Sequence, residues 1–358
     1  MYSQFIDEIS EKYAYDDELK IAIEKTIPLM IERYGEENKE EVFSLFRNLK
    51  IFSCEDINKE TLDSIRGQVM GDNNKHVVEI ETESAYGSGA EASSAYSYET
   101  LYDENMDILG EFRWLVVKDM KGSVHADLYK EKFGATINMP YFIHEINHAY
   151  AMQHPKYVID GNKIYSKHGM YETVDEFERE GDMVELRTVS KSHVILEEMI
   201  NESISQEMLV ELLNVKDYDE VKEIYEEIHH VSTGYTSSVI FLAQQLEQAL
   251  GRDNLDKYRM NNASSIIKDF NITASQSSIS DIYFKDQTAY DYLSEKCFEI
   301  FSLSQTGFMY SPDEYGAKMR ELLWDGIATI DAYKGVSLDD YERIRSEALG
   351  TVEEKKQL

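Results

Sequence analysis

Residues 142–154 read Phe-Ile-His-Glu-Ile-Asn-His-Ala-Tyr-Ala-Met-Gln-His, and His144, Glu145 and His148 form an H-E-x-x-H pattern within them. Residues four apart lie on one face of a helix, so the two imidazoles can converge on a single Zn²⁺. The glutamate between them then projects beside the metal. Pro140 suits the first turn of such a helix, and apolar residues around the histidines supply faces that can be buried. The stretch therefore predicts a helix with His144 and His148 as zinc ligands.

A catalytic zinc usually takes a third protein ligand, and His154 is one candidate. It extends the motif to H-E-x-x-H-x-x-A-x-x-H, in which Ala151 stands where the metzincin pattern has glycine. That glycine allows a sharp turn out of the helix, and alanine makes such a turn at a cost if it needs positive φ. Pro155 follows at once, so His154 more simply marks the end of the helix.

Glu202 is the second candidate for the third ligand. It lies in a predicted helix over 193–214, and three apolar side chains fall within about 60° of it at 100° per residue, namely Ile195, Met199 and Leu209. A carboxylate on an apolar stripe is costly unless it is paired or bound to metal. Glu202 is therefore preferred, and Glu198, which falls near the same face, remains an alternative.

The two motifs together resemble the gluzincin branch of the zincin metallopeptidases. Bacterial members read roughly H-E-x-x-H followed by L-N-E-G-I-T-E, and residues 200–206 of this chain read Ile-Asn-Glu-Ser-Ile-Ser-Gln. The resemblance covers about residues 135–260. Ser203 replaces a glycine, and Gln206 replaces an acidic residue that in the family often orients a zinc-bound histidine. The amide oxygen of Gln206 can still accept that N–H, with less basicity passed to the ligand.

The resemblance implies a zinc-dependent peptidase that acts on a peptide or protein substrate. Zn²⁺ would be held by His144, His148 and Glu202, and Glu145 would be the general base. Gluzincins commonly use a tyrosine or histidine beyond the third-ligand helix to stabilise the oxyanion. In the matching region of this chain Tyr235 is the first choice for that role and His230 the second.

The rest of the chain predicts an α+β fold that is predominantly helical. Helical spacing over 5–50 is followed by β-like runs at 76–83 and 112–118, with a small polar connection over 84–98 between them, and the chain is mostly helical from Pro140 onward. The predicted helices in this part are 140–153, 193–214, 219–229, 236–250, 291–303, 314–333 and 338–349, with C-terminal caps at Gly251 and Gly350.

These elements suggest three segments, which can equally form one continuous unit. An N-terminal helical segment spans 1–75, and a helical C-terminal lobe spans 261–358. Between them, 76–260 would form a zincin-like catalytic core with a small β-sheet and the H-E-x-x-H helix. The run at 134–139, just before that helix, is a candidate for the sheet edge that zincins use to bind substrate as an added strand.

The composition limits the possible partners. The 36 Lys and Arg against 69 Asp and Glu give a formal net charge of −33, which repels phosphate backbones and anionic lipid. Nucleic-acid and membrane binding are therefore not expected. No targeting signal or run of about 18 apolar residues is present, and the only cysteines, Cys54 and Cys297, fit two reduced thiols. We expect a cytoplasmic protein.

One rival function comes from a different class. A non-catalytic acidic interaction protein, either a nucleic-acid mimic or an inactive zincin scaffold, would explain the charge but would not predict histidines at ligand spacing. The acidic cluster over 172–185 is expected to be a solvated face. The sequence predicts no oligomeric state.

Overall fold

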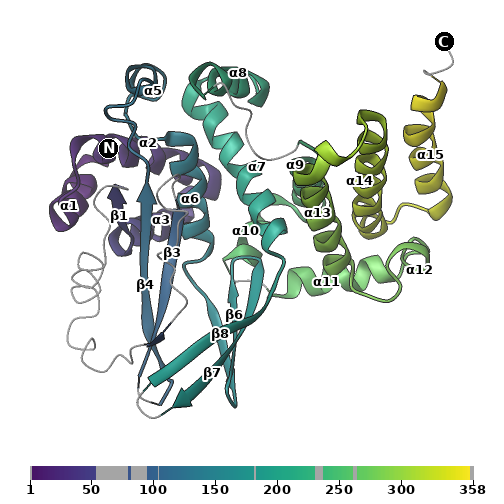
Figure 1. The fold of residues 1–358 in the computed structure, drawn as a ribbon, viewed down its shortest axis with the longest axis horizontal. Coiled ribbons are helices and arrows are strands. Elements are labelled where there is room, and N and C mark those ends of the chain that lie inside the picture. Colours follow the sequence, from purple (N-terminus) through teal and green to yellow (C-terminus); the bar gives the residue numbers. More distant parts are fainter. Residues whose placement is uncertain are drawn as a thin grey trace.

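The computed structural model describes residues 2–53, 80–81, 95–103, 105–180, 183–229, 237–260 and 264–354. These residues form a mostly helical α+β fold with two small sheets, which confirms the predicted class at this level. Figure 1 shows the first sheet beside α6 (Met139–Ala151), the second sheet below the end of α7 (Val194–Leu213), and the last helices forming a lobe to one side.

The N-terminal helices begin the main core. The side chain of Asp16 caps the second helix by accepting a hydrogen bond from the backbone N–H of Leu19, which satisfies one of the free donors at a helix start. The helical spacing predicted over 5–50 is confirmed. The elements are α1 (Ser3–Tyr13), α2 (Asp17–Tyr34), a 3₁₀ turn η1 (Glu36–Asn38) and α3 (Lys39–Asn48).

The first sheet has the strand order β1-β4-β3. Its central strand confirms the predicted 112–118 run, and its last strand begins inside the segment predicted as a connection over 84–98. The strands are β1 (Lys50–Ser53), β3 (Ala95–Tyr102) and β4 (Ile108–Val117), with β1 parallel and β3 antiparallel to β4. Among the described strands, β3 is therefore an edge, and it lies against α6 (Met139–Ala151).

The second sheet corrects the expectation that the chain is mostly helical after Pro140. The order of this sheet is β2-β8-β7-β6-β5. Its last four strands, within residues 156–192, form an antiparallel meander because each pairs with the next strand along the chain. The long hairpin of the last two strands carries charged residues on both faces, including the facing pair Glu178 and Glu185, so apolar alternation is weak there. The strands are β2 (Ile80–Glu81), β5 (Lys156–Asp160), β6 (Lys163–His168), β7 (Tyr171–Glu180) and β8 (Met183–Ser192). Of the run predicted as a strand over 76–83, only residues 80–81 are described.

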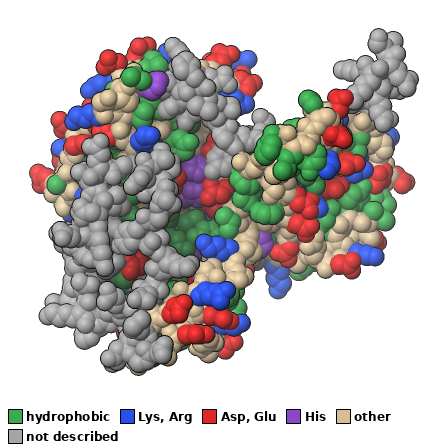
Figure 2. All heavy atoms as spheres, in the orientation of Figure 1, with side chains coloured by type: hydrophobic (Ala, Val, Ile, Leu, Met, Phe, Trp, Pro, Cys, Tyr) green, Lys and Arg blue, Asp and Glu red, His purple; other side chains and the backbone are tan. Residues whose placement is uncertain are grey.

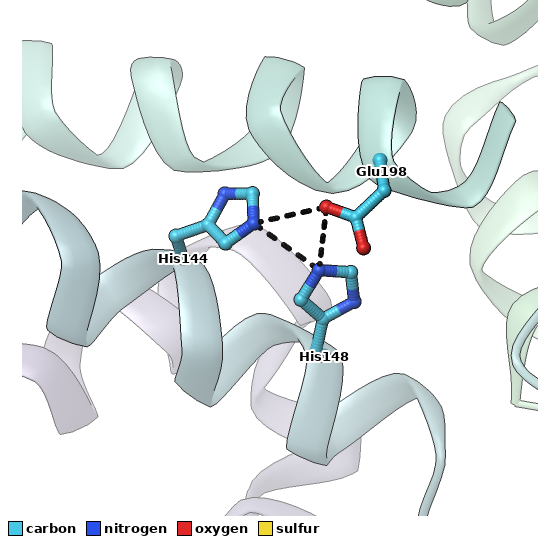
Figure 3. Close-up of side chains that lie close together, drawn as sticks. All are labelled: His144, His148 and Glu198. Carbon is cyan, nitrogen blue, oxygen red and sulfur yellow. Dashed lines mark hydrogen bonds and ion pairs between the residues drawn. The ribbon is translucent and has the colours of Figure 1, made fainter. Parts of the chain in front are cut away.

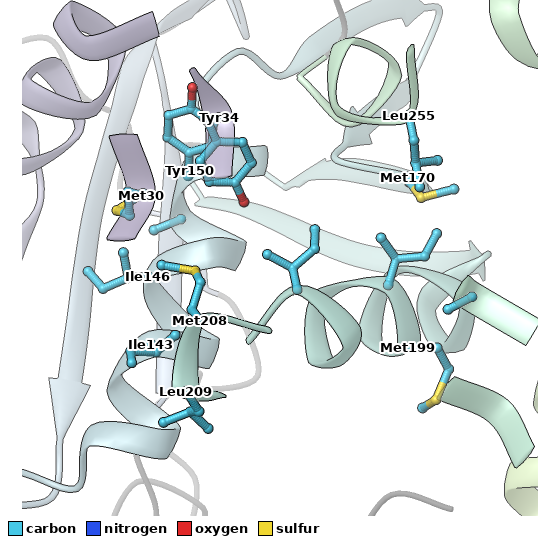
Figure 4. Close-up of a cluster of buried hydrophobic side chains, with 14 of the residues drawn as sticks. Met30, Tyr34, Ile143, Ile146, Tyr150, Met170, Met199, Met208, Leu209 and Leu255 are labelled. Atoms are coloured by element: carbon cyan, nitrogen blue, oxygen red, sulfur yellow. The ribbon is translucent and has the colours of Figure 1, made fainter. Parts of the chain in front are cut away.

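The central helix α7 (Val194–Leu213) packs beside α6 in the main core. Figure 4 shows Tyr34 stacked on Tyr150, with ring centroids 4.1 Å apart, close to side chains of both helices. Buried residues of this one cluster run from Phe5 to Tyr341, so all three predicted segments contribute to it.

The remaining helices match the predictions within a few residues, with additions. Leu250 ends α9 and Gly251 follows with φ of +84°, as predicted, whereas Gly350 lies inside the last helix rather than at its end. No helix among the described residues is long and apolar enough to cross a membrane. The helices are α5 (Ala126–Phe133), α8 (Tyr218–His229), α9 (Ser237–Leu250), α10 (Arg252–Arg259), α11 (Ser265–Ser275), α12 (Ser280–Tyr283), α13 (Ala289–Thr306), α14 (Pro312–Lys334) and α15 (Leu338–Glu354), with a 3₁₀ turn η3 (Gly307–Met309).

Candidate metal centre

The two motif histidines point toward one carboxylate of the neighbouring helix. His144 and His148 project from α6, and Glu198 projects from α7 toward both (Figure 3). The Nε2 atoms of the two histidines are 3.1 Å apart, and Oε2 of Glu198 lies 3.4 Å from the first and 3.3 Å from the second. Two nitrogens and one oxygen thus form a nearly equilateral triangle.

The size of this triangle fits a small tetrahedral metal ion. Zinc–nitrogen and zinc–oxygen bonds of about 2.0–2.1 Å at the tetrahedral angle place neighbouring ligand atoms about 3.3 Å apart. The three measured edges lie within about 0.3 Å of that value. Two imidazoles with one carboxylate are also a ligand set that zinc uses in hydrolytic enzymes. His144, His148 and Glu198 therefore could hold zinc and leave a fourth position open.

Glu202 lies on the other side of the first histidine. Its Oε2 is 3.0 Å from Nδ1 of His144, while its Oε1 accepts a hydrogen bond of 3.1 Å from Nε2 of Gln206. An imidazole that binds metal through Nε2 commonly donates its Nδ1–H to a carboxylate. The geometry therefore favours Glu198 over Glu202 as the third ligand, and places Glu202 where it can orient His144.

A second carboxylate lies behind the other histidine. Nδ1 of His148 is buried and makes no hydrogen bond to any described residue, and Oε1 of Glu197 faces it at 3.7 Å. Glu197 is only 1% exposed and is paired with the equally buried Arg259 at 2.5 Å. Each histidine thus has a carboxylate on its Nδ1 side, one in hydrogen-bond contact and one slightly farther away.

Glu145 lies beside the two histidines on α6. It follows His144 in the sequence and, with the two histidines and Glu198, lines one cavity. Its Oε2 accepts a 2.7 Å hydrogen bond from the backbone N–H of Tyr96 on β3. Burial raises the pKa of Glu145 above its usual value, although the two histidines oppose that shift. A carboxylate with a raised pKa holds a transferred proton more readily.

The charges of the centre are strongly coupled. Burial alone would lower the pKa of the histidines, but the facing glutamates outweigh it, raising the pKa of His144 well above its usual value and that of His148 to about 9. Burial would raise the pKa of Glu198, yet the histidines hold it below its usual value. A divalent cation would replace the shared protons as the positive partner of this carboxylate.

The centre opens into a cavity of about 340 Å³ between β3, α6 and the β7–β8 hairpin. In Figure 2 histidine and acidic side chains are visible together in a hollow near the middle of the molecular face. Thr173, Asp175, Thr188 and Lys191 of the hairpin contribute to its lining. His144, His148 and Glu198 therefore line a cavity rather than a closed core.

Tyrosines form one wall of the cavity. The hydroxyls of Tyr98 and Tyr171 are 2.8 Å apart, and the ring of Tyr98 stacks on His168 with centroids separated by 4.3 Å. Burial lowers the pKa of His168 to about 3, so this imidazole is neutral. The stack fixes both tyrosines at the cavity wall.

The structure separates other predicted residues from this centre or does not describe them. His154 is half-exposed and its Nε2 lies 3.1 Å from Glu41, so it is not the third ligand. Tyr235 and His230 lie outside the described residues. The run at 134–139 is not the sheet edge beside the metal helix, since β3 occupies that place.

Two residues of the centre were missed by sequence reasoning. Glu197 stands outside the residues that carry the zincin resemblance, and Arg259 lies in a short polar helix with no motif. The spacing of Glu198 and Glu202 did carry a signal, because these carboxylates are four residues apart on α7, as the two histidines are on α6. Two such pairs on packed helices can face each other.

The comparisons with known proteins add no assignment. No family model, curated protein or solved structure matches this chain.

Proposed function

We propose that this protein is a zinc-dependent metallopeptidase in which His144, His148 and Glu198 bind the metal. The observation that carries the proposal is the triangle of two Nε2 atoms and one carboxylate oxygen with edges of 3.1–3.4 Å. Glu145 beside this triangle adds the acid–base group that hydrolysis requires.

The choice of Glu198 also improves the resemblance to gluzincins. With Glu198 as ligand, the acidic residue expected four positions later is Glu202, which contacts Nδ1 of His144. The departure at Gln206 then disappears, because Gln206 lies one turn beyond the motif. A zincin-like core is therefore part of the proposal, with the motif displaced by one helical turn from its first assignment.

Zinc, when bound, lowers the pKa of a coordinated water toward neutrality and polarises the carbonyl of a peptide bond. Glu145 accepts one proton from the attacking water as the oxygen adds to the carbonyl carbon. The same carboxyl then donates that proton to the departing amine as the C–N bond breaks, so that one water yields a carboxylic acid and an amine. The backbone N–H of Tyr96 holds the carboxylate of Glu145 in place during both transfers.

Two measurements test the proposal. We expect one zinc per chain by elemental analysis, and loss of that zinc in His148→Ala. A peptide-library digest should detect cleavage by the zinc-loaded protein. Glu145→Gln should keep zinc and lose about 10²–10⁴-fold in rate, because proton transfer contributes that much.

Glu41→Gln on the surface is the matched control and should retain full activity. A chain that binds no zinc when zinc is supplied in excess would disprove the metal site. If zinc binds but no peptide in the library is cut, the inactive-scaffold alternative is favoured. Equal cleavage by Glu145→Gln and the wild type would remove Glu145 from its role.

A further inference from the structure

Arg259 is a buried cation at the end of α10, far from the metal motifs in sequence. It is 1% exposed, and its guanidinium donates hydrogen bonds to two side chains of α7. Nη2 donates to Oε1 of Glu197 at 2.5 Å and to Oδ1 of Asn201 at 2.9 Å, and Nε donates to Oε2 of Glu197 at 3.3 Å. Nε and Nη2 thus bind the two oxygens of Glu197 as a fork, a geometry that a lysine ammonium cannot reproduce, and Nη2 also reaches Asn201 one helical turn farther along.

Both residues that Arg259 binds, Glu197 and Asn201, contact α6. Glu197 faces Nδ1 of His148 at 3.7 Å, and Nδ2 of Asn201 donates a 2.7 Å hydrogen bond to the backbone carbonyl of His144. One guanidinium therefore reaches both predicted zinc-binding histidines, each through a single α7 residue.

The carboxylate of Glu197 is fixed from a second side. Its Oε2 accepts a 3.0 Å hydrogen bond from the backbone N–H of Met170, at the turn between β6 and β7. The preceding Gly169 has φ of +59°, and a Cβ there would lie 3.0 Å from the same oxygen. The turn can approach Glu197 this closely because residue 169 is glycine.

Arg259 forms a 2.5 Å ion pair with Glu197, whereas His148 faces the same carboxylate from 3.7 Å. A carboxylate that is 1% exposed is costly without a partner, and removing the guanidinium takes away two of the N–H donors that orient Glu197 while the backbone N–H of Met170 remains. Oδ1 of Asn201 would lose the N–H donor of Arg259 at the same time.

We propose that Arg259 is a positioning residue for the metal centre, which orients His148 through Glu197 and the α6 backbone at His144 through Asn201. The inference rests on the proposed zinc site, and it assigns to α10 a role in metal affinity. Residues that orient metal ligands typically change affinity by about 10–100-fold when they are removed.

The test compares Arg259→Met with Arg33→Met. Arg33 is also buried, and it binds Asp256 on the same helix α10 at 3.0 Å and Glu247 at 3.2 Å, so its loss removes a comparable ion pair without contacting α7 beside the histidines. We expect Arg259→Met to weaken zinc binding about 10–100-fold in a competition assay with a chelating dye. Arg33→Met should lower thermal stability and leave the zinc Kd unchanged.

Arg259→Lys keeps the positive charge, and it tests the positioning role of Arg259 if the methionine variant does not fold. We expect it to have an intermediate zinc Kd, because an ammonium cannot bind both oxygens of Glu197 as the fork of Nε and Nη2 does. An unchanged Kd in both Arg259 variants, or equal losses in the Arg259 and Arg33 variants, would overturn the inference while leaving the zinc site intact.

A second readout needs no metal. In the metal-free protein, the ¹⁵N resonances of the His148 ring should shift in the Arg259 variants and stay in place in Arg33→Met. If the wild type binds no zinc, the proposed function fails and these resonances alone decide the inference. Unchanged His148 resonances would then refute a positioning role.

Discussion

The choice between Glu198 and Glu202 as the third ligand gives the sharpest prediction. Each is changed to alanine, because alanine removes every ligand oxygen and both positions lie within the same helix, α7. Glu198 faces the Nε2 atoms of both histidines, and Glu202 faces Nδ1 of His144 alone. The first change should remove a ligand and the second an orienting group.

The two losses differ in expected size. Four-ligand zinc sites bind with about 10–16 kcal/mol, so one ligand represents roughly 2.5–4 kcal/mol, or about a 60- to 700-fold change in Kd. Loss of an outer partner typically costs about 10–100-fold. We therefore expect Glu198→Ala to weaken zinc binding more than Glu202→Ala, with His144 retained as a ligand in both.

Zinc affinity is measured by competition with a chromophoric chelator at constant pH and ionic strength. Glu207→Ala is the matched control, since Glu207 is on the same helix, is 40% exposed and pairs with Arg252 rather than with a histidine. Its Kd should equal that of the wild type. A greater loss of zinc affinity in Glu202→Ala than in Glu198→Ala would refute Glu198 as the third ligand and restore Glu202, which the sequence favours.

Two further predictions concern buried groups away from the metal. Because burial depresses the native pKa of His168 to about 3, the unfolded chain takes up a proton that the native protein does not, and stability falls as pH drops through about 6.5. Between pH 7.5 and 5 this term amounts to about 2 kcal/mol, so denaturant titrations of His168→Phe should show a pH dependence smaller by that amount, and an identical dependence would contradict it. Burial also raises the pKa of Cys297 to about 12; in a Cys54→Ser background the native protein should not react with a thiol reagent at pH 8, whereas the denatured chain should titrate one thiol, and rapid native labelling would show that the core around α13 opens.

The motif helix was predictable because its signal is local. Spacing of four places His144 and His148 on one face in any helix, and the structure places that helix over Met139–Ala151, within two residues of the predicted bounds at each end. The proline near its start and the apolar residues around the motif are also local properties. Nothing from a distant part of the chain was needed for this part of the site.

The third ligand could not be chosen by the same means. The stripe argument assumes that a helix buries one face, but α7 contacts α2, α6, α8, α9 and α13 and is buried over most of its circumference. Glu197 and Glu202 are both buried, while the side chain of Glu198 keeps 30% exposure because it opens into the cavity. The sequence argument expects the ligand to be the more buried carboxylate. In the structure the proposed ligand, Glu198, is instead the more exposed one.

The meander over 156–192 was missed for a related reason. Its buried side chains are few and include Ile164, His168, Thr173 and Val184, and much of the hairpin carries polar residues on both faces. A strand with two solvated faces lacks the alternation from which strands are recognised. This segment nevertheless forms one side of the cavity, through Thr173, Thr188 and Lys191.

The register between α6 and α7 decides which carboxylate faces the Nε2 atoms of both histidines. Histidines spaced by four and carboxylates spaced by four can be aligned in more than one way, each offset by a turn. Two buried hydrogen bonds remove that freedom, because Asn201 donates to the carbonyl of His144 and Asn147 donates to the hydroxyl of Ser205 at 3.2 Å. With these contacts in place, Glu198 lies beside both Nε2 atoms. The identity of the proposed third ligand is therefore a consequence of polar packing between α6 and α7, which motif spacing does not contain.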